Sequence, residues 1–275
     1  KNQQIKGFLM TTNYCREYLE DLAGTEDEDL KLPHINSYFI KRAVKFRLPN
    51  RGVILDVVNP DKITAEDIQT KMPSVISHLR LPYDEIVLEY NMPNPANPQK
   101  NTSIMVLASN TSEGVAFRLI SRIVKQGVNY WSHFAVGGIV TGDFEVRYGV
   151  IDGNEDAQDG SGMVVFYNAY VLLSFIAALQ CSNVVEGIDP APPKLNKSRA
   201  KKGKEPLFDY KTLTIDTKKQ VTKIEGQQAG EPKHTKREHL RRGHIRRYEN
   251  KTIWVNPCVV GDSEKGRIKK DYLVI

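Results

Sequence analysis

The stretch that decides the fold is residues 163–179, MVVFYNAYVLLSFIAAL, the most apolar segment of the chain. At about 1.5 Å per residue a helix of this length would be roughly 25 Å long, which is short for a membrane span. The segment also carries the polar Asn168 and Ser174. We therefore predict a core helix that lies across a sheet, and no association with a membrane.

The residues before this helix predict the sheet on which it packs. Between Thr102 and Val150, glycine- and asparagine-containing turns recur about every ten residues, and the segments between them are rich in Val, Ile, Phe and Tyr. This pattern is typical of an antiparallel meander. The expected strands cover 103–108, 115–124, 130–136 and 144–150.

Further upstream, helical and strand patterns alternate. The expected elements are an amphipathic helix over 5–22, a buried strand over Val53–Val58, a helix that begins at the capping-box-like Thr64–Asp67 motif, a strand over Glu85–Tyr90 and a proline-rich extended loop over 93–98. The predicted fold class is α+β, with a mostly antiparallel sheet packed against helices and a basic C-terminal portion.

Composition sets the broad class of protein. The chain has 275 residues, 40 % hydrophobic and 26 % charged, with a mean hydropathy of −0.43. These values are ordinary for a globular protein and exclude a peptide hormone and a polytopic membrane protein. The three cysteines lie far apart and predict reduced, mostly buried thiols. The opening residues lack the pattern of a signal peptide, so we expect a cytoplasmic location.

Charge is distributed unevenly along the chain. Residues 1–193 carry 17 Lys and Arg against 23 Asp and Glu, a net −6, whereas residues 194–275 carry 22 against 10, a net +12. We therefore divide the chain into an acidic portion, 1–189, and a basic portion, 190–275, which we expect to be integrated into the same fold. The basic portion favours nucleic acid, the ribosome or an acidic protein as a partner.

The first basic segment follows the stiff connector formed by Pro190, Pro192 and Pro193. Residues 194–204 contain six cations and no acid, so the segment must be exposed. Its candidate RNA- or peptide-binding residues are Lys197, Arg199, Lys201 and Lys202.

The second basic segment is the densest motif of the sequence. Residues 236–247 hold six Arg or Lys and two His. Glu249 and Asn250 separate two segments of strand composition, which predicts a hairpin in which Ile245 faces Trp254. Arg246 and His244 would then project from the opposite face. Arginine suits bidentate contacts to phosphate or carboxylate, so Arg241, Arg242, His244 and Arg246 are candidate binding residues.

Two chemical roles are open to the histidines. His239 and His244 are five residues apart, and neither a helix nor a strand brings such a pair onto one ion, so no metal or cofactor is predicted. A ribonuclease that uses His239 and His244 as acid and base, over a phosphate held by Arg241 and Arg242, remains the alternative.

The run Arg237–Arg247, the following Ile253–Pro257 and the closing Lys270–Tyr272 resemble a family of phage and mobile-element proteins. The pattern from Asn183 through 195–199 to 207–210 resembles it as well. The family is the second group of type V-A anti-CRISPR proteins, and the resemblance is clearest over 183–275.

The resemblance implies a host-defence antagonist that recognises the N-terminal peptide of a type V-A CRISPR nuclease as it leaves the ribosome, after which the encoding mRNA is degraded. The expected partners are that peptide and the ribosome or mRNA. Whether the protein is itself an enzyme stays open, with a stand-alone ribonuclease or a general RNA- or ribosome-binding protein as the alternative. An extended peptide would add to an open strand edge of the meander, where Tyr130, Trp131 and Phe134 would form apolar walls.

Overall fold

The fold was analysed in a computed structural model. It describes residues 13–23, 31–55, 57–94, 97–125, 128–132, 136–150, 158–216, 237–241, 244–249, 251–255, 258–260 and 262–267. The first residues of the expected 5–22 helix, Phe134, Arg242 and the segment 268–275 lie outside these ranges.

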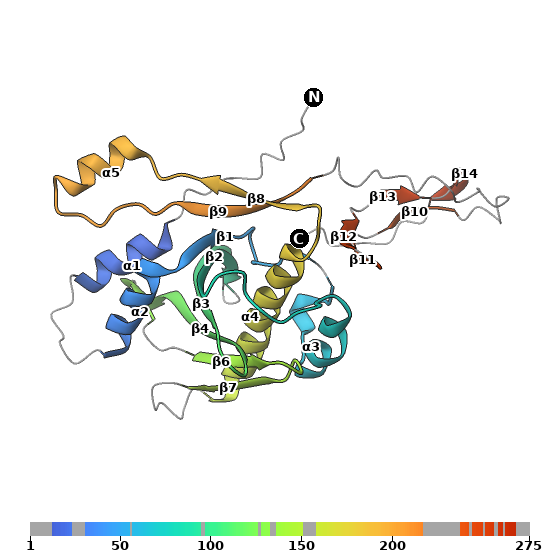
Figure 1. Ribbon diagram of the computed structural model, residues 1–275, viewed down its shortest axis with the longest axis horizontal. Helices are drawn as coiled ribbons and strands as arrows, with labels where there is room; N and C mark the ends of the chain where they lie inside the picture. Colours follow the sequence, from blue (N-terminus) through green and yellow to red (C-terminus); the bar gives the residue numbers. More distant parts are fainter. Residues whose placement is uncertain are drawn as a thin grey trace.

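Runs of strands are separated by helices along the described chain (Figure 1). The helices are α1 (Tyr14–Ala23), α2 (Lys31–Arg42), η1 (Pro60–Lys62), α3 (Ala65–Lys71), η2 (Met72–Ser74), α4 (Gln158–Leu179) and α5 (Pro193–Ala200). The strands are β1 (Val44–Arg47), β2 (Glu85–Asn94), β3 (Asn97–Asn110), β4 (Gly114–Lys125), β5 (Val128–Trp131), β6 (Val136–Thr141), β7 (Val146–Val150), β8 (Val184–Asp189), β9 (Tyr210–Ile215), β10 (Arg237–Arg241), β11 (His244–Tyr248), β12 (Lys251–Val255), β13 (Cys258–Val260) and β14 (Asp262–Arg267).

One large sheet organises the described residues. Its strands run in the order β7-β6-β4-β3-β2-β1-β9-β8, with β5 paired to β4 outside this path. All pairings in it are antiparallel except those of β1, which is parallel to both β2 and β9. The expected α+β class with a mostly antiparallel sheet is confirmed, and so is the meander, although the expected 130–136 strand is divided between β5 and β6.

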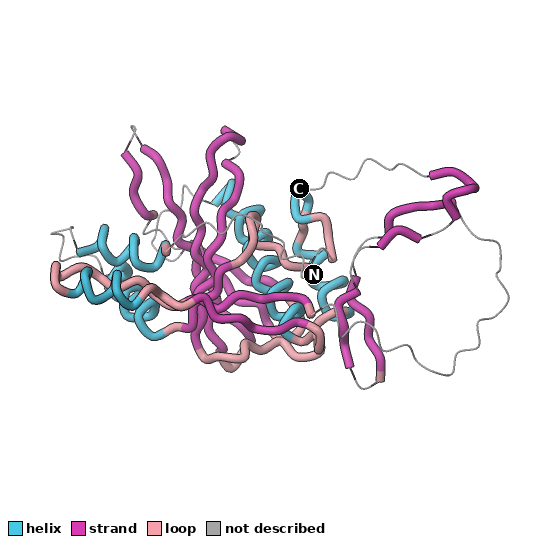
Figure 2. The backbone as a smooth tube through the Cα atoms, turned by 90° about the horizontal axis from the view of Figure 1, so that it is seen from above, coloured by secondary structure: helices cyan, strands magenta, loops and turns pink. Residues whose placement is uncertain are grey.

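The two faces of the sheet differ in chemistry because side chains alternate along each strand. The face toward α4 is apolar and includes Phe46, Leu88, Val106 and Phe117. The opposite face carries Lys45, Arg47, Glu85, Glu89, Arg118 and Arg122, and of these Arg47 and Glu89 lie directly opposite each other in the register. Helices α1 and α2 cover part of this second face through a smaller apolar cluster, and Figure 2 shows helices on both sides of the strands.

Helix α4 confirms the expected core helix. Within the described chain, one helix is long and apolar enough to cross a membrane, and 72 % of its Gly162–Leu179 window is buried inside the protein. Phe175 meets Phe46 edge to face at a centroid distance of 4.7 Å. The apolar length of this helix is therefore used to fill the core above the sheet.

The expected strand at Val53–Val58 was wrong. The described part of this segment is an irregular loop, although Leu55 and Val58 are buried. The hydroxyl of Tyr170 on α4 accepts from the backbone N–H groups of Val57 and Val58 at 2.8 and 3.0 Å, and donates toward the Leu55 carbonyl at 3.0 Å. A side chain satisfies this backbone, so the segment has no need of a neighbouring strand.

Two upstream expectations have different outcomes. The capping box is confirmed, because the Thr64 hydroxyl accepts from Asp67 N while the Asp67 carboxylate accepts from Thr64 N. The expectation of a proline-rich loop over 93–98 was wrong, because β2 continues to Asn94 and β3 begins at Asn97. Pro93 lies opposite Asn101 in this pair.

The C-terminal third joins the main sheet through β8 and β9. Strand β9 lies beside β1, with Phe46 opposite Lys211, and β8 forms the outer edge. The expected boundary between 189 and 190 thus falls inside the β8–β9 connection, and a segment of the basic portion completes the sheet built by the acidic portion.

Candidate functional site

The second basic motif forms the hairpin that its sequence predicts. Strands β11 and β12 pair antiparallel, with Ile245 opposite Trp254. Trp254 is buried in the main core and Ile245 packs against it. The side-chain amide of Asn183, itself fully buried, donates to Trp254 O at 2.7 Å and accepts from Trp254 N at 2.8 Å. We call β11 and β12 the arginine hairpin; Asn183 fixes it beside the end of α4.

Exposed cations lie on both faces of the arginine hairpin, because consecutive residues of a strand point to opposite faces. Arg246 lies on the face away from the core, with its guanidinium 5.0 Å from the centre of the Tyr248 ring, whereas Arg247 lies on the face of Ile245 and donates to the Pro73 carbonyl at 3.4 Å. Lys251 approaches the same ring at 5.7 Å. The expected exposure of Arg246 is confirmed.

The remaining residues of the motif are divided between two sheets. His244 begins β11, whereas His239 and Arg241 lie in β10, opposite Val260 and Cys258 of β13. Among the described residues, no group of His, Cys, Asp or Glu has an arrangement that would hold a metal ion.

The first basic segment forms α5 and the turn after it, residues 193–204, which we call the lysine prong. Two side chains fix the prong to the rest of the protein. The Asn196 amide bonds to Leu207 N and O at 2.8 and 2.9 Å, while Arg199 donates to the Glu205 carbonyl at 2.7 Å and forms an ion pair with Glu20 of α1. Arg199 therefore has a structural role, in contrast to the binding role expected for it.

The other cations of the prong face solvent. Lys194, Lys197, Lys201, Lys202 and Lys204 are all exposed, and the described residues provide none of them with an ion-pair partner. The prong also exposes Leu195 but contains no acid. Five uncompensated ammonium groups on a short, anchored element form a local positive field.

The two basic surfaces are separate. The arginine hairpin is bonded to Asn183, immediately before β8, whereas the lysine prong follows the other end of β8. At about 3.3 Å per residue, the six residues of β8 span roughly 20 Å. Figure 1 shows α5 and β11–β12 at opposite ends of the β8–β9 hairpin. A ligand that contacts both surfaces must therefore be long.

A buried polar cluster lies under α1 on the polar face of the sheet. The Glu89 carboxylate accepts from Cys15 N at 2.7 Å and from the Tyr210 hydroxyl. Lys45, one strand away, donates to the Ala43 carbonyl at 2.7 Å and lies 4.3 Å from the Phe208 ring centre. Glu89 thus satisfies the N-terminal end of α1, where backbone N–H groups have no intrahelical acceptor.

Burial controls the protonation of this cluster. It raises the pKa of Glu89, raises the pKa of the Cys15 thiol well above its usual range and lowers the pKa of Lys45. The Cys15 thiol is therefore protonated at neutral pH and is a poor nucleophile. These residues join β1, β2, α1 and β9, and we assign them a structural role.

Of the three expected peptide-binding aromatics, Trp131 is the one whose side chain the structure describes, and it does not line an open groove. Trp131 is only 1 % exposed and its ring packs against Tyr14 and Tyr18 of α1, at centroid distances of 5.7 and 6.3 Å. Tyr130 lies opposite Ile123 in the β4–β5 pair. Trp131 therefore anchors α1 to the sheet, and the expectation that it lines a peptide site was wrong.

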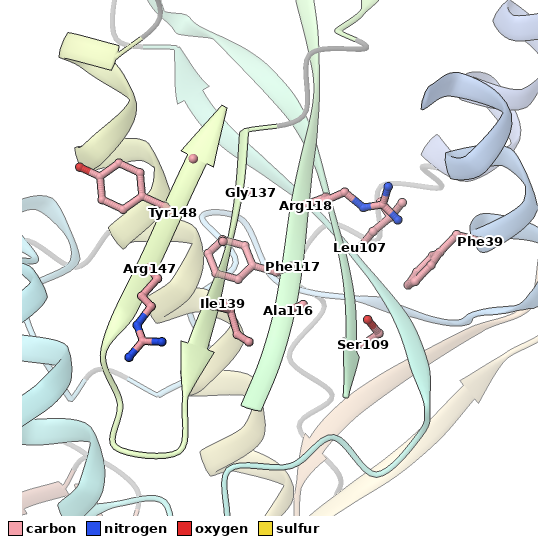
Figure 3. Close-up of a pocket in the computed structure, with 12 residues that line it drawn as sticks. Phe39, Leu107, Ser109, Ala116, Phe117, Arg118, Gly137, Ile139, Arg147 and Tyr148 are labelled. Atoms are coloured by element: carbon pink, nitrogen blue, oxygen red, sulfur yellow. The ribbon is translucent and has the colours of Figure 1, made fainter. Parts of the chain in front are cut away.

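The structure places an open groove elsewhere on the polar face, beside α2. It has a volume of about 580 Å³ and its floor is formed by β3, β4, β6 and β7 (Figure 3). Two cross-strand rows line it: Leu107, Arg118, Gly137 and Gly149, and Ser109, Ala116, Ile139 and Arg147. Phe39 of α2 forms one wall. The sequence pattern did not predict this site.

Comparisons with known proteins add no relative: no protein-family model, curated protein or solved structure matches the chain.

Proposed function

We propose that this protein is an anti-defence factor that recognises the nascent N-terminal peptide of a type V-A CRISPR nuclease and promotes degradation of the nuclease mRNA on the ribosome. The resemblance of residues 183–275 to the second group of type V-A anti-CRISPR proteins supports the class. The partners are the peptide and the ribosome or mRNA, in the cytoplasm of a bacterial host.

The observation that carries the proposal is the lysine prong. Its five exposed ammonium groups have no partners among the described residues, while Asn196 and Arg199 fix its backbone. Lysine contacts phosphate as a point charge, which suits binding to an RNA backbone without selection of sequence. The prong thus provides a surface for ribosomal RNA or mRNA, and peptide recognition supplies the selectivity.

A bacterial translation extract tests the proposal. The extract is programmed with the nuclease mRNA or with a frameshifted mRNA that differs from it by only a few nucleotides but encodes another N-terminal peptide. We expect the protein to shorten the half-life of the first mRNA and not of the second. Equal half-lives would overturn the proposal, and cleavage of a bare transcript without ribosomes would favour the ribonuclease.

The role of the prong is tested with two matched double variants. Lys201→Gln with Lys202→Gln removes two charges from the prong, whereas Lys62→Gln with Arg80→Gln removes two exposed charges elsewhere. We expect the first pair alone to reduce co-sedimentation with ribosomes and to flatten its dependence on salt, by about one unit of slope for each phosphate that is no longer neutralised. Equal co-sedimentation of the two variants would remove the prong from the mechanism.

A further inference from the structure

The groove beside α2 contains an arginine that the fold leaves without an acceptor. Arg118 projects from β4 toward Phe39, and its guanidinium carbon lies 5.9 Å from the centre of that ring (Figure 3). Within the described part of the chain it has no hydrogen bond or ion pair, and burial lowers its pKa. A half-buried guanidinium of this kind has lost part of its hydration without gaining a protein acceptor.

The nearest acid is already occupied. The carboxylate of Glu85 interacts electrostatically with Arg118. It is, however, bonded to two guanidinium nitrogens of Arg42, one of them at 3.2 Å. At the opposite side of the groove, Arg147 is held by Glu145 at 2.8 Å. Arg118 is therefore the cation of the groove that is available to an external anion.

The floor between Arg118 and the sheet edge consists of two glycines, of which Gly137 is buried and Gly149 is exposed. Gly137 and Gly149 continue the row of Arg118 across β6 and β7. A Cβ atom placed on Gly149 would meet nothing within 4 Å. With strands about 4.8 Å apart, these two glycines provide a path of roughly 10 Å from Arg118 to β7, which is an edge strand of the sheet.

We propose that this groove binds an extended peptide segment and that Arg118 pairs with a carboxylate of that segment. Charge complementarity fixes the chemistry of the occupant, and the apolar Phe39, Leu107 and Ile139 provide contacts for its neighbouring side chains. This inference rests on the proposed function, because it assigns the site at which the nuclease peptide would bind. That site differs from the one expected at Tyr130, Trp131 and Phe134. Peptide capture on the groove and RNA contact at the lysine prong then use different surfaces.

The test measures peptide affinity by fluorescence anisotropy with two groove variants. The peptides are the labelled N-terminal segment of the nuclease and a copy with its Asp and Glu changed to Asn and Gln. Arg118→Gln should weaken binding of the first peptide about tenfold or more and leave the weaker binding of the second unchanged, since a charge-assisted bond contributes about this much.

Gly149→Leu should fill the groove and weaken both peptides. The control Gly142→Leu places the same side chain in a turn that also has open space, and should bind as the wild type does. Gly149→Leu and Gly142→Leu should have the melting temperature of the wild type. If Arg118→Gln and Gly149→Leu bind the peptides with unchanged affinity, the proposal that the peptide binds in this groove is wrong.

A second arm separates this inference from the proposed function. If the wild type does not bind the nuclease peptide, the proposed function fails. A display library of ten-residue peptides is then selected on the wild type and on Arg118→Gln. If peptides selected on the wild type, but not those selected on Arg118→Gln, are enriched in acidic residues, the groove is a peptide site. If the two proteins select the same peptides, the inference is wrong.

Discussion

At the scale of residues, the fold depends on polar side chains that satisfy buried backbone. Tyr170 holds the loop at 55–58 with one hydroxyl, Asn183 holds the arginine hairpin with one amide, and Glu89 holds the start of α1. Each of them bonds to a segment distant in sequence. Such residues define where irregular or late segments attach to the core.

Glu89 should make stability depend on pH. Because burial raises its pKa in the folded protein, its stabilising contribution is complete below its ordinary value of 4.5 and is lost as the pH rises through the raised value. Glu89→Gln keeps an oxygen acceptor for Cys15 N and Tyr210 but does not ionise. We expect urea unfolding between pH 4 and 8 to show that the free energy of unfolding of the variant increases relative to that of the wild type as the pH rises. The total difference should be about 1.4 kcal/mol for each unit by which the pKa of Glu89 is raised.

The control for this experiment is Glu113→Gln, which removes an exposed carboxylate and should reproduce the wild-type profile. A Glu89→Gln profile parallel to that of the wild type would show that the carboxylate is stabilised by its neighbours as strongly as by water.

At the scale of elements, the arginine hairpin combines an inward anchor with an outward basic face. Trp254 and Ile245 contact the core, whereas Arg246 lies on the other face of β11 and is exposed. Stability and binding are therefore assigned to different residues of one element, which makes the two roles separable by mutation.

Substitutions in the hairpin should separate these roles. Trp254→Ala should lower the free energy of unfolding by about 3–5 kcal/mol, because it leaves a cavity in the core. Arg246→Ala should change it by less than about 0.5 kcal/mol, as exposed positions usually do, and yet reduce mRNA degradation in the translation extract. An Arg246→Ala protein that melts early, or one that retains full activity, would contradict the assignment.

The elements that sequence predicts well are those with strong local signals. The apolar run of α4, the Thr64–Asp67 capping box and the Glu249 turn of the hairpin each carry their own pattern, and all three form. β1 was missed because it has four residues and mixes Lys and Arg with Val and Phe; its pairing with β9 is non-local. The 53–58 segment has strand composition, but Tyr170 offers its backbone a competing partner.

The groove was missed for a related reason. Gly137 follows the expected 130–136 strand and is typical of a turn, whereas it lies inside the paired β6; Gly149 falls within the expected 144–150 strand, and the two glycines form the floor of the groove. A glycine inside a strand is also a sign of close approach by another chain, and that interpretation would have directed attention to this surface. Arg118 has no local signal at all, because its lack of an acceptor depends on the Arg42–Glu85 pair.

At the scale of the whole molecule, one sheet unites the acidic and basic portions. Strand β9 lies inside the sheet order, between β1 and β8, and Tyr210 at its start donates to the buried Glu89. The acidic portion alone therefore leaves a strand edge open and a buried carboxylate uncovered. The charge asymmetry of the sequence does not correspond to two independent cores.

Truncation should reveal this dependence. A fragment of residues 1–189 lacks β9, and we expect it to show no cooperative thermal transition by circular dichroism. A fragment of residues 1–216 retains β9 and loses only the later strands, so it should unfold cooperatively but at a lower temperature than the full chain, because Trp254 no longer fills the core. Cooperative unfolding of the 1–189 fragment would show instead that the acidic portion folds alone.

The position of β9 also determines when the sheet can be completed during synthesis. Phe46 of β1 pairs with Lys211 of β9, so β1 is synthesised long before its partner strand. At about 5–20 residues per second, the ribosome needs roughly ten to thirty seconds to make the intervening chain. Throughout that interval the outer edge of β1 is open to other nascent chains. β1 carries Lys45 and Arg47, and charges on an open strand edge disfavour edge-to-edge association. The two cations that later pack beside Phe208 and Tyr210 thus serve earlier as protection against aggregation.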